Sequence, residues 1–113
     1  MIPSKQKVGV QLFKTLTQKG RSFHSESFSL RVFFDDKAER PHFSVVVTKK
    51  LEKSAVKRNA MKRKVFVLLR PFLSLARKEA VCAIFLKKKT DSKTLPALKV
   101  EIEVALKKAG VVG

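Results

Sequence analysis

The residues best suited to chemistry in this sequence are cations concentrated at positions 49–64. Half of these residues are Lys or Arg, and Glu52 is the only acid among them. Arg can contact two phosphate oxygens at once, Lys neutralises phosphate as a point charge, and Asn59 offers donors and acceptors to a sugar or a base. A solvated helix face would usually mix charges of both signs. The segment therefore predicts a surface that binds a nucleic-acid backbone.

Other side chains that could perform chemistry are few and scattered. His24 and His42 have no Cys or His at zinc-ligand spacing. Asp35 and Asp36 are adjacent and could hold Mg²⁺, but their setting is typical of a solvated turn. Cys82 stands alone in an apolar run, which indicates a buried core residue rather than a nucleophile. The sequence thus predicts neither catalytic residues nor metal ligands in the protein.

A helix is expected to position the cations, because apolar residues of helical spacing overlap the end of the basic segment. At about 100° per residue, Arg63 and Arg70 project from the opposite side of this helix. We expect the helix to begin near Ser54 as its cap and to run to about Ala76, with Pro71 kinking or ending it. The predicted core-facing residues, spaced by four, three and four, are Met61, Val65, Leu68 and Phe72.

The bulk composition indicates one strongly cationic domain over residues 1–113. The chain is 44% hydrophobic, which supports a folded core. Its net charge of +17 disfavours compactness unless a polyanion covers it. No apolar run approaches the ~20 residues of a membrane-spanning helix, and the first residues lack the apolar segment of a secretory signal. We expect a cytoplasmic protein with neither a membrane nor a small-molecule partner.

The remaining elements are predicted by alternation and by apolar runs. The segment 81–86 is apolar throughout, which predicts a strand buried on both faces inside the sheet. The strands at 28–32 and 43–48 are expected to form an antiparallel pair, with helices mainly on one side of an α+β fold. In chain order we expect a helix at 9–19, strands at 22–24, 28–32 and 43–48, the basic helix, the strand at 81–86, and a helix at 94–109 with Pro96 in its first turn and Gly110 after its end.

The expected architecture favours RNA over DNA as the polyanion. Neither a helix-turn-helix nor a zipper is visible, whereas a mixed sheet with an attached helix is typical of RNA-binding domains. In such domains exposed aromatic side chains stack on unpaired bases. The candidates for stacking, each of which is more often a core residue in a chain this small, are Phe13, Phe23, Phe28 and Phe34.

The basic segment and its flanks resemble a known family. The run 47–50, Val-Thr-Lys-Lys, is followed by Ala-Val-Lys-Arg-Asn-Ala-Met-Lys-Arg at 55–63. This order resembles the signature of the bacterial ribonuclease P protein subunit, in which a strand ending in Ser-Lys-Lys leads into a helix bearing Arg-Asn-Arg and then Lys-Arg. Phe13, Leu16 and Gly20 also resemble that family's residues ahead of its first strand. The similarity covers residues 9–109.

The resemblance implies a fold and an activity that the residues alone do not. It implies a two-layer α+β fold, with a four-stranded mixed sheet, about three helices and a left-handed βαβ crossover. It also implies that an RNA subunit removes the 5′ leader of precursor transfer RNA with Mg²⁺, which is bound mainly by that RNA. The protein would then be a non-catalytic subunit of an endoribonuclease, with ribonuclease P RNA and precursor transfer RNA as its partners.

The implied sites fall on two surfaces. Phe13 and Arg31 are expected to hold the single-stranded leader. The residues expected to dock on the catalytic RNA are Lys49, Lys50, Lys53, Lys57, Arg58, Asn59, Lys62 and Arg63.

The sequence departs from the family pattern at several positions. Ala60 replaces the third residue of the Arg-Asn-Arg triplet, and we expect Lys57 to compensate for the missing cation. Glu52 stands where many members have an apolar residue or glycine. Thr17 and Arg31 stand where the family often has an aromatic residue, so aromatic contacts to the leader are expected from Phe13 alone.

Other functions compatible with the charge stay open at this point. A ribosomal or other structural RNA-binding protein shares the fold class but would not stimulate precursor cleavage. A non-specific DNA-binding protein should prefer duplex DNA to structured RNA. A protein-only nuclease is less favoured, because the sequence has no evident carboxylate cluster for two metals.

Overall fold

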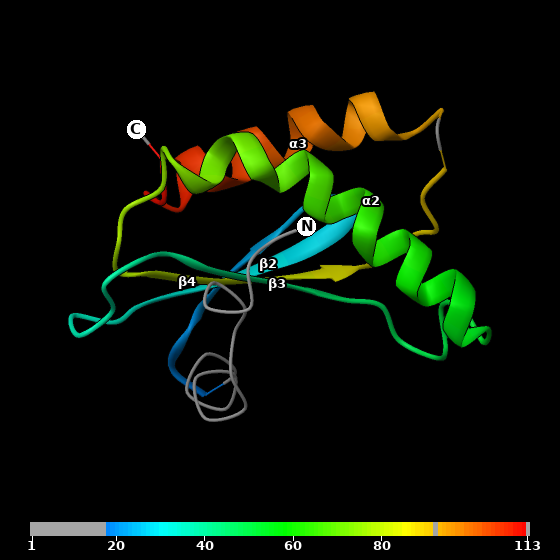
Figure 1. Cartoon of the computed structure of the whole chain (residues 1–113), viewed down its shortest axis with the longest axis horizontal. Coiled ribbons are helices and arrows are strands. Elements are labelled where there is room, and N and C mark those ends of the chain that lie inside the picture. Colours follow the sequence, from blue (N-terminus) through cyan, green and yellow to red (C-terminus); the bar gives the residue numbers. More distant parts are fainter. Residues whose placement is uncertain (1–17, 92, 113) are drawn as a thin grey trace.

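A four-stranded sheet carries two helices on one of its faces (Figure 1). The computed structural model describes residues 18–91 and 93–112. This arrangement confirms the predicted two-layer α+β fold with a mixed sheet. In chain order the elements are β1 (Arg21–His24), β2 (Phe28–Phe34), β3 (His42–Val46), α2 (Ala55–Leu73), β4 (Ala80–Leu86) and α3 (Leu95–Lys108).

The first predicted helix falls largely on residues that the structure does not describe. Gln18 and Lys19, at its expected C-terminal end, are helical. Phe13, and with it half of the predicted leader-binding pair, lies outside the described residues.

The strand order is β1-β2-β4-β3, with β4 inside the sheet as predicted. β2 pairs with β4 in antiparallel orientation, whereas β3 pairs with β4 in parallel orientation. The predicted antiparallel pairing of β2 with β3 is therefore wrong. β4 is apolar on both faces and lies between two strands, and all of its residues except Phe85 are buried. β3 has only one apolar face and takes the sheet edge.

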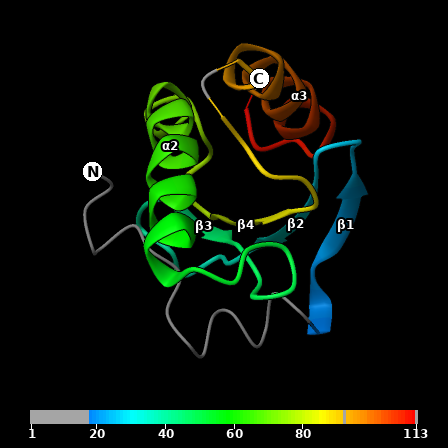
Figure 2. The same cartoon turned by 90° about the vertical axis from the view of Figure 1, so that its right-hand side faces the viewer.

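The connection from β3 through α2 to β4 is left-handed. In Figure 2, β3 lies to the left of β4 and α2 lies above the sheet. Figure 1 shows that both strands run toward the end of the molecule that faces the viewer in Figure 2, and that α2 runs back. The path therefore turns opposite to the right-handed crossover usual for parallel strands. This is the handedness that the family resemblance implies.

The core lies between the sheet and the two helices. The β2–β4 register places Leu30 opposite Ile84 and Val32 opposite Cys82, so alternate residues face the helices. Their partners from β3 are Phe43 and Val45. The buried residues that the helices contribute are Met61, Val65, Leu69 and Phe72 from α2, and Leu98, Ile102, Ala105 and Leu106 from α3.

The predicted core seam of α2 is wrong at one position, because Leu69 is fully buried and Leu68 is only half-buried. Val65 lies at the centre of the buried stripe with no exposed surface. At about 100° per residue, Leu69 lies about 40° from Val65, whereas Leu68 lies about 60° away on the other side. The closer residue takes the buried position.

The helix ends largely follow the local signals. Pro71 lies inside the last turn of α2, which ends at Leu73 rather than near Ala76. Pro96 occupies the first turn of α3 as predicted. Gly110 follows α3 with a φ of 77°, a left-handed conformation that glycine adopts without strain. None of the described helices is long and apolar enough to cross a membrane.

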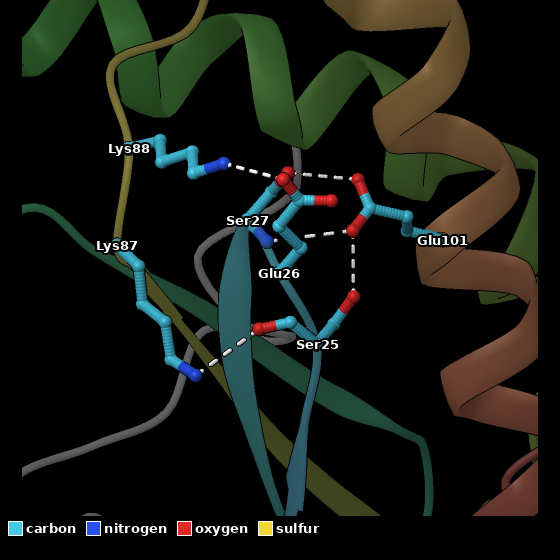
Figure 3. A network of polar contacts seen from close by, with 6 residues as sticks. All are labelled: Ser25, Glu26, Ser27, Lys87, Lys88 and Glu101. Atoms are coloured by element: carbon cyan, nitrogen blue, oxygen red, sulfur yellow. Dashed lines mark hydrogen bonds and ion pairs between the residues drawn. The ribbon is translucent and has the colours of Figure 1, made fainter.

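A polar network ties the β1–β2 turn to α3 (Figure 3). Ser25 Oγ donates to Glu101 Oε1 at 2.6 Å, and Ser27 Oγ donates to Glu101 Oε2 at 2.8 Å. Lys87 Nζ donates to the Ser25 carbonyl at 3.1 Å, which adds the loop after β4. Partial burial by itself raises the pKa of Glu101, but the hydrogen bonds from the two serines outweigh it, so the pKa is lower than usual.

The buried seam can be tested by truncating its two neighbouring leucines. Leu69→Ala should lower the free energy of unfolding by about 2–5 kcal/mol, because it leaves a cavity in a filled core. Leu68→Ala, the matched control, should cost clearly less, since Leu68 is half-exposed. Urea unfolding of both variants measures the difference. Equal losses would contradict the assignment of Leu69 to the core.

The Glu101 network predicts a specific pH dependence of stability. Because the folded-state pKa is lower than the ordinary value of 4.5, the ionised Glu101 stabilises the fold above about pH 4.5. This contribution is lost as the pH falls through the lowered value. Glu101→Gln should therefore reduce the drop in unfolding free energy between pH 7 and pH 3. The control Glu103→Gln, on the same helix, should leave that drop nearly unchanged.

Candidate nucleic-acid interface

The loop between β3 and α2 is held by short-range hydrogen bonds. The N–H groups of Leu51 and Glu52 both donate to the Thr48 carbonyl at 3.1 Å, which makes a tight turn. Ser54 then caps α2, since its side chain accepts from the Lys57 N–H at 3.3 Å. The predicted cap residue is confirmed. These bonds fix where the basic segment leaves the sheet and where its helix begins.

Arg58 holds this loop against the first turns of α2. Its Nη1 donates to the carbonyl oxygens of Glu52 and Lys53, each at 2.9 Å. Arg58 is half-buried as a result. The side chain therefore shapes the loop that carries Lys53, in addition to the cationic charge that the sequence analysis assigned to it.

The structure places all eight predicted RNA-docking residues in the loop before α2 and its first three turns. We call this set the basic ridge. Its exposed members are Lys49, Lys50, Lys53, Lys57, Asn59 and Arg63, and its half-buried members are Arg58 and Lys62. Figure 1 shows this end of α2 reaching past the end of the sheet. The ridge cations are thus presented together at one end of the molecule.

No cation of the basic ridge forms a salt bridge within the described part of the protein, although Glu52 lies close enough to Lys57 for their charges to interact. The ion pairs found within residues 18–91 and 93–112 all involve other cations, namely Arg77, Lys88, Lys89 and Lys107. The first turn of α2 contains no acidic residue. Its free N–H groups and the positive end of its dipole add to the same potential. The ridge therefore favours an anionic ligand.

A second cationic segment, formed by the three lysines at 87–89, lies beside the ridge. Lys89 Nζ is 3.5 Å from Glu52 Oε1, which brings the loop after β4 against the loop before α2. The Ser54 N–H donates to Glu52 Oε2 at 3.2 Å. That hydrogen bond, with the nearby charge of Lys89, holds the pKa of Glu52 below its usual value. The lysine triplet at 87–89 is visible in the sequence, but only the fold shows that it lies beside the basic ridge.

Arg31 lies on the other face of the sheet, away from both helices. It stands opposite Ala83 and Ser22 in the register, on the face where Phe33 and Phe85 pack against Val81 and Ala83. Its guanidinium donates to Ser22 Oγ at 2.9 Å and to the Gly20 carbonyl at 3.2 Å. The structure thus separates Arg31 from the basic ridge.

The described residues bring no catalytic group together. They contain no cluster of three or more His, Cys, Asp or Glu side chains that could hold a metal ion. Cys82 is buried in β4, and burial raises the pKa of its thiol far above the usual range. Asp35 Oδ1 accepts from the Lys37 N–H at 3.1 Å, as expected of a turn residue. The chemistry available to the basic ridge is the binding of phosphate groups and the screening of their negative charge.

Comparison with known proteins identifies the class to which this fold and ridge belong. The family model Ribonuclease P matches residues 9–110. The chain therefore belongs to the Ribonuclease P family. No curated protein sequence matches it.

Solved structures agree on the fold. The RNase P protein of Staphylococcus aureus matches with a TM-score of 0.77 and 21% identity, covering 93% of this chain and 94% of that one. A mutant of the S. aureus protein with defective mRNA degradation activity gives a TM-score of 0.79 at 20% identity, with coverages of 94% and 89%. The RNase P protein of Thermotoga maritima gives 0.63 at 17% identity, with coverages of 90% and 92%. The fold is that of the bacterial ribonuclease P protein component, and the chain is a subunit of ribonuclease P, which acts in transfer-RNA processing.

The cap of α2 can be tested separately from its charge. Ser54→Ala should lower the free energy of unfolding by about 1 kcal/mol, because one N–H of the first turn loses its acceptor. The control Ser74→Ala, at the C-terminal end of the same helix, should change stability by less, since Ser74 caps through its backbone. Thermal or urea unfolding measures both. A similar loss in the two variants would contradict the capping role.

Proposed function

We propose that the basic ridge binds the catalytic RNA of ribonuclease P. The observation that carries this proposal is the gathering of seven cations and Asn59 at one end of α2, where none of these cations forms a salt bridge among the described residues. Cations that are not paired internally release counterions when they meet phosphate, which gives binding its free energy. The ridge would also screen repulsion between the RNA and its substrate, so that less Mg²⁺ is needed.

The proposal assigns the protein a supporting part in the reaction. The RNA subunit would remove the 5′ leader of precursor transfer RNA, and Mg²⁺ would supply the activation of water and the charge stabilisation that this hydrolysis needs. We propose that this Mg²⁺ is bound mainly by the RNA. The protein's own residues bind phosphate and orient the two RNAs. This takes place in the cytoplasm, where transfer-RNA precursors are made.

The second part of the proposal concerns the single-stranded leader. Arg31 lies on the sheet face opposite the helices, and the register places it between the positions of Phe33 and Phe85. Such a face suits a single strand, because a guanidinium can contact phosphate while aromatic rings contact bases. We propose that Arg31 holds the leader on this face, and that Phe13, which lies outside the described residues, also contacts the leader.

A reconstitution experiment tests the function directly. The purified chain is added to a bacterial ribonuclease P RNA and a precursor transfer RNA at low Mg²⁺, and mature 5′ ends are counted. We expect the protein to stimulate cleavage strongly. Tight RNA binding without stimulation would favour a structural RNA-binding protein, and a preference for duplex DNA in competition would favour a DNA-binding protein.

The basic ridge predicts a strong dependence of RNA affinity on salt. If about six phosphates are neutralised, log affinity should fall with log salt at a slope of about −5. Replacing Lys50, Lys53 and Lys57 with Gln should make the slope shallower by about 2 to 3, because three contacts are lost. Fluorescence anisotropy over a salt series measures it.

A matched control keeps the total charge change the same. In this control, Lys78, Lys99 and Lys108 are replaced with Gln, all exposed and outside the ridge. We expect its salt slope to stay close to that of the unmodified chain. Equal changes in both triple variants would contradict docking through the ridge, since net charge alone would then explain affinity.

A further inference from the structure

The β1 strand leaves one edge of the sheet open among the described strands. The Ser25 N–H donates to the Phe28 carbonyl at 2.8 Å, which makes these two residues a hydrogen-bonded pair. Hydrogen-bonded and non-hydrogen-bonded pairs alternate along antiparallel strands. His24 and Ser22 therefore belong to non-bonded pairs with β2. Their backbone N–H and C=O groups face outward, where a further strand could bind them.

Two hollows lie near this free edge. One hollow, of about 310 Å³, is lined by Phe23 of β1 and by Val100, Val104 and Ala105 of α3, among others. A second hollow, of about 300 Å³, also includes Phe23 and is lined mainly by residues of β1 and β2, with Ala109 after the end of α3. Val100 and Val104 are 60% and 48% exposed. They lie one turn apart on α3, whose other side is packed into the core. We call the free edge and the two hollows the edge groove; Figure 2 shows β1 and α3 on the same side of the molecule.

The charges around the edge groove favour an acidic ligand. Lys19 and Arg21 line one hollow, and Lys108 lines the other. Glu101 is the one carboxylate among the lining residues, and its oxygens accept from Ser25 and Ser27. A second copy of this chain would bring a net charge of +17 to this cationic surface. Self-association through the groove is therefore disfavoured at ordinary salt.

We propose that the edge groove binds an acidic, extended polypeptide segment, which adds to β1 as a fifth strand. The outward backbone groups of Ser22 and His24 pair with the segment, as in other cases of strand addition. Because side chains alternate along a strand, every second residue of the segment faces α3 and contacts Val100 and Val104. Acidic residues of the segment lie near Lys19, Arg21 and Lys108.

The position of the edge groove makes this partner independent of RNA docking. β1 lies at the edge of the sheet opposite β3, and α2 lies over the β3 side in Figure 2. A polypeptide in the groove and an RNA on the basic ridge would occupy different sides of the molecule. The groove thus gives ribonuclease P a place to bind a protein, which goes beyond the function proposed above.

Synthetic peptides test the proposal on the full chain. The probe is a blocked octapeptide of four Val-Glu repeats, compared with one of four Val-Lys repeats and with an eight-residue oligouridine. We expect the Val-Glu peptide to bind and to slow hydrogen exchange at the Ser22 and His24 amides. The Val-Lys peptide should bind at least about tenfold more weakly. NMR titration follows both the affinity and the amides.

Two matched double variants test the apolar contact. Val100→Ser with Val104→Ser removes the valines of the groove, and Val56→Ser with Val67→Ser removes two exposed valines of α2. The first should weaken binding of the Val-Glu peptide about tenfold and the second should not. All four positions are exposed, so both variants should keep the unfolding midpoint of the unmodified chain.

Several results would overturn the proposal. One is the absence of binding by the Val-Glu peptide at millimolar concentration, and another is equal binding to the two double variants. Binding without protection of the Ser22 and His24 amides would exclude strand addition. Oligouridine that protects the same amides with equal affinity would assign the groove to nucleic acid instead.

Discussion

The structure depends on the division of α2 into a buried side and a charged end. Val65 and Leu69 have no exposed surface, and they fix the helix on the sheet through packing. This packing must outweigh the repulsion among ridge cations that form no salt bridge with a described carboxylate. A chain with a net charge of +17 can do so because its core is continuous across the sheet and both helices. The basic ridge is therefore a concentration of positive charge on a well-packed scaffold.

Local hydrogen bonds fix the backbone of the loop before α2, from which several of the ridge cations project. Thr48 and Ser54 hold the turn and the cap, and Arg58 binds two carbonyl groups of the loop. One cation of the ridge is thus used to order its neighbours. Lys53 and Lys57 then project from a fixed backbone, so less conformational entropy is lost when a ligand binds. Glu52 and Lys89 extend the same arrangement to the loop after β4.

Much of the fold could be predicted from the sequence, because its signals are local. The cap at Ser54, the turn glycine at 110 and the apolar run of β4 each depend on a few neighbouring residues. What failed depended on distant contacts. The pairing of β2 with β4 rather than β3 joins residues about 50 positions apart, and no periodicity in either strand encodes it. The choice between Leu68 and Leu69 is decided by where the sheet lies, which a helical spacing alone leaves open.

The place of β4 also sets the order in which the chain can fold. β2 and β3 both pair with β4, so neither of these two pairings can form until α2 and β4 have left the ribosome. Until then the β1–β2 hairpin and the basic helix have no shared core, and such long-range pairing is slow to form. We expect the nascent chain to stay open until its last third is synthesised. The most cationic segment of the protein is then exposed beside ribosomal RNA before its own fold can restrain it.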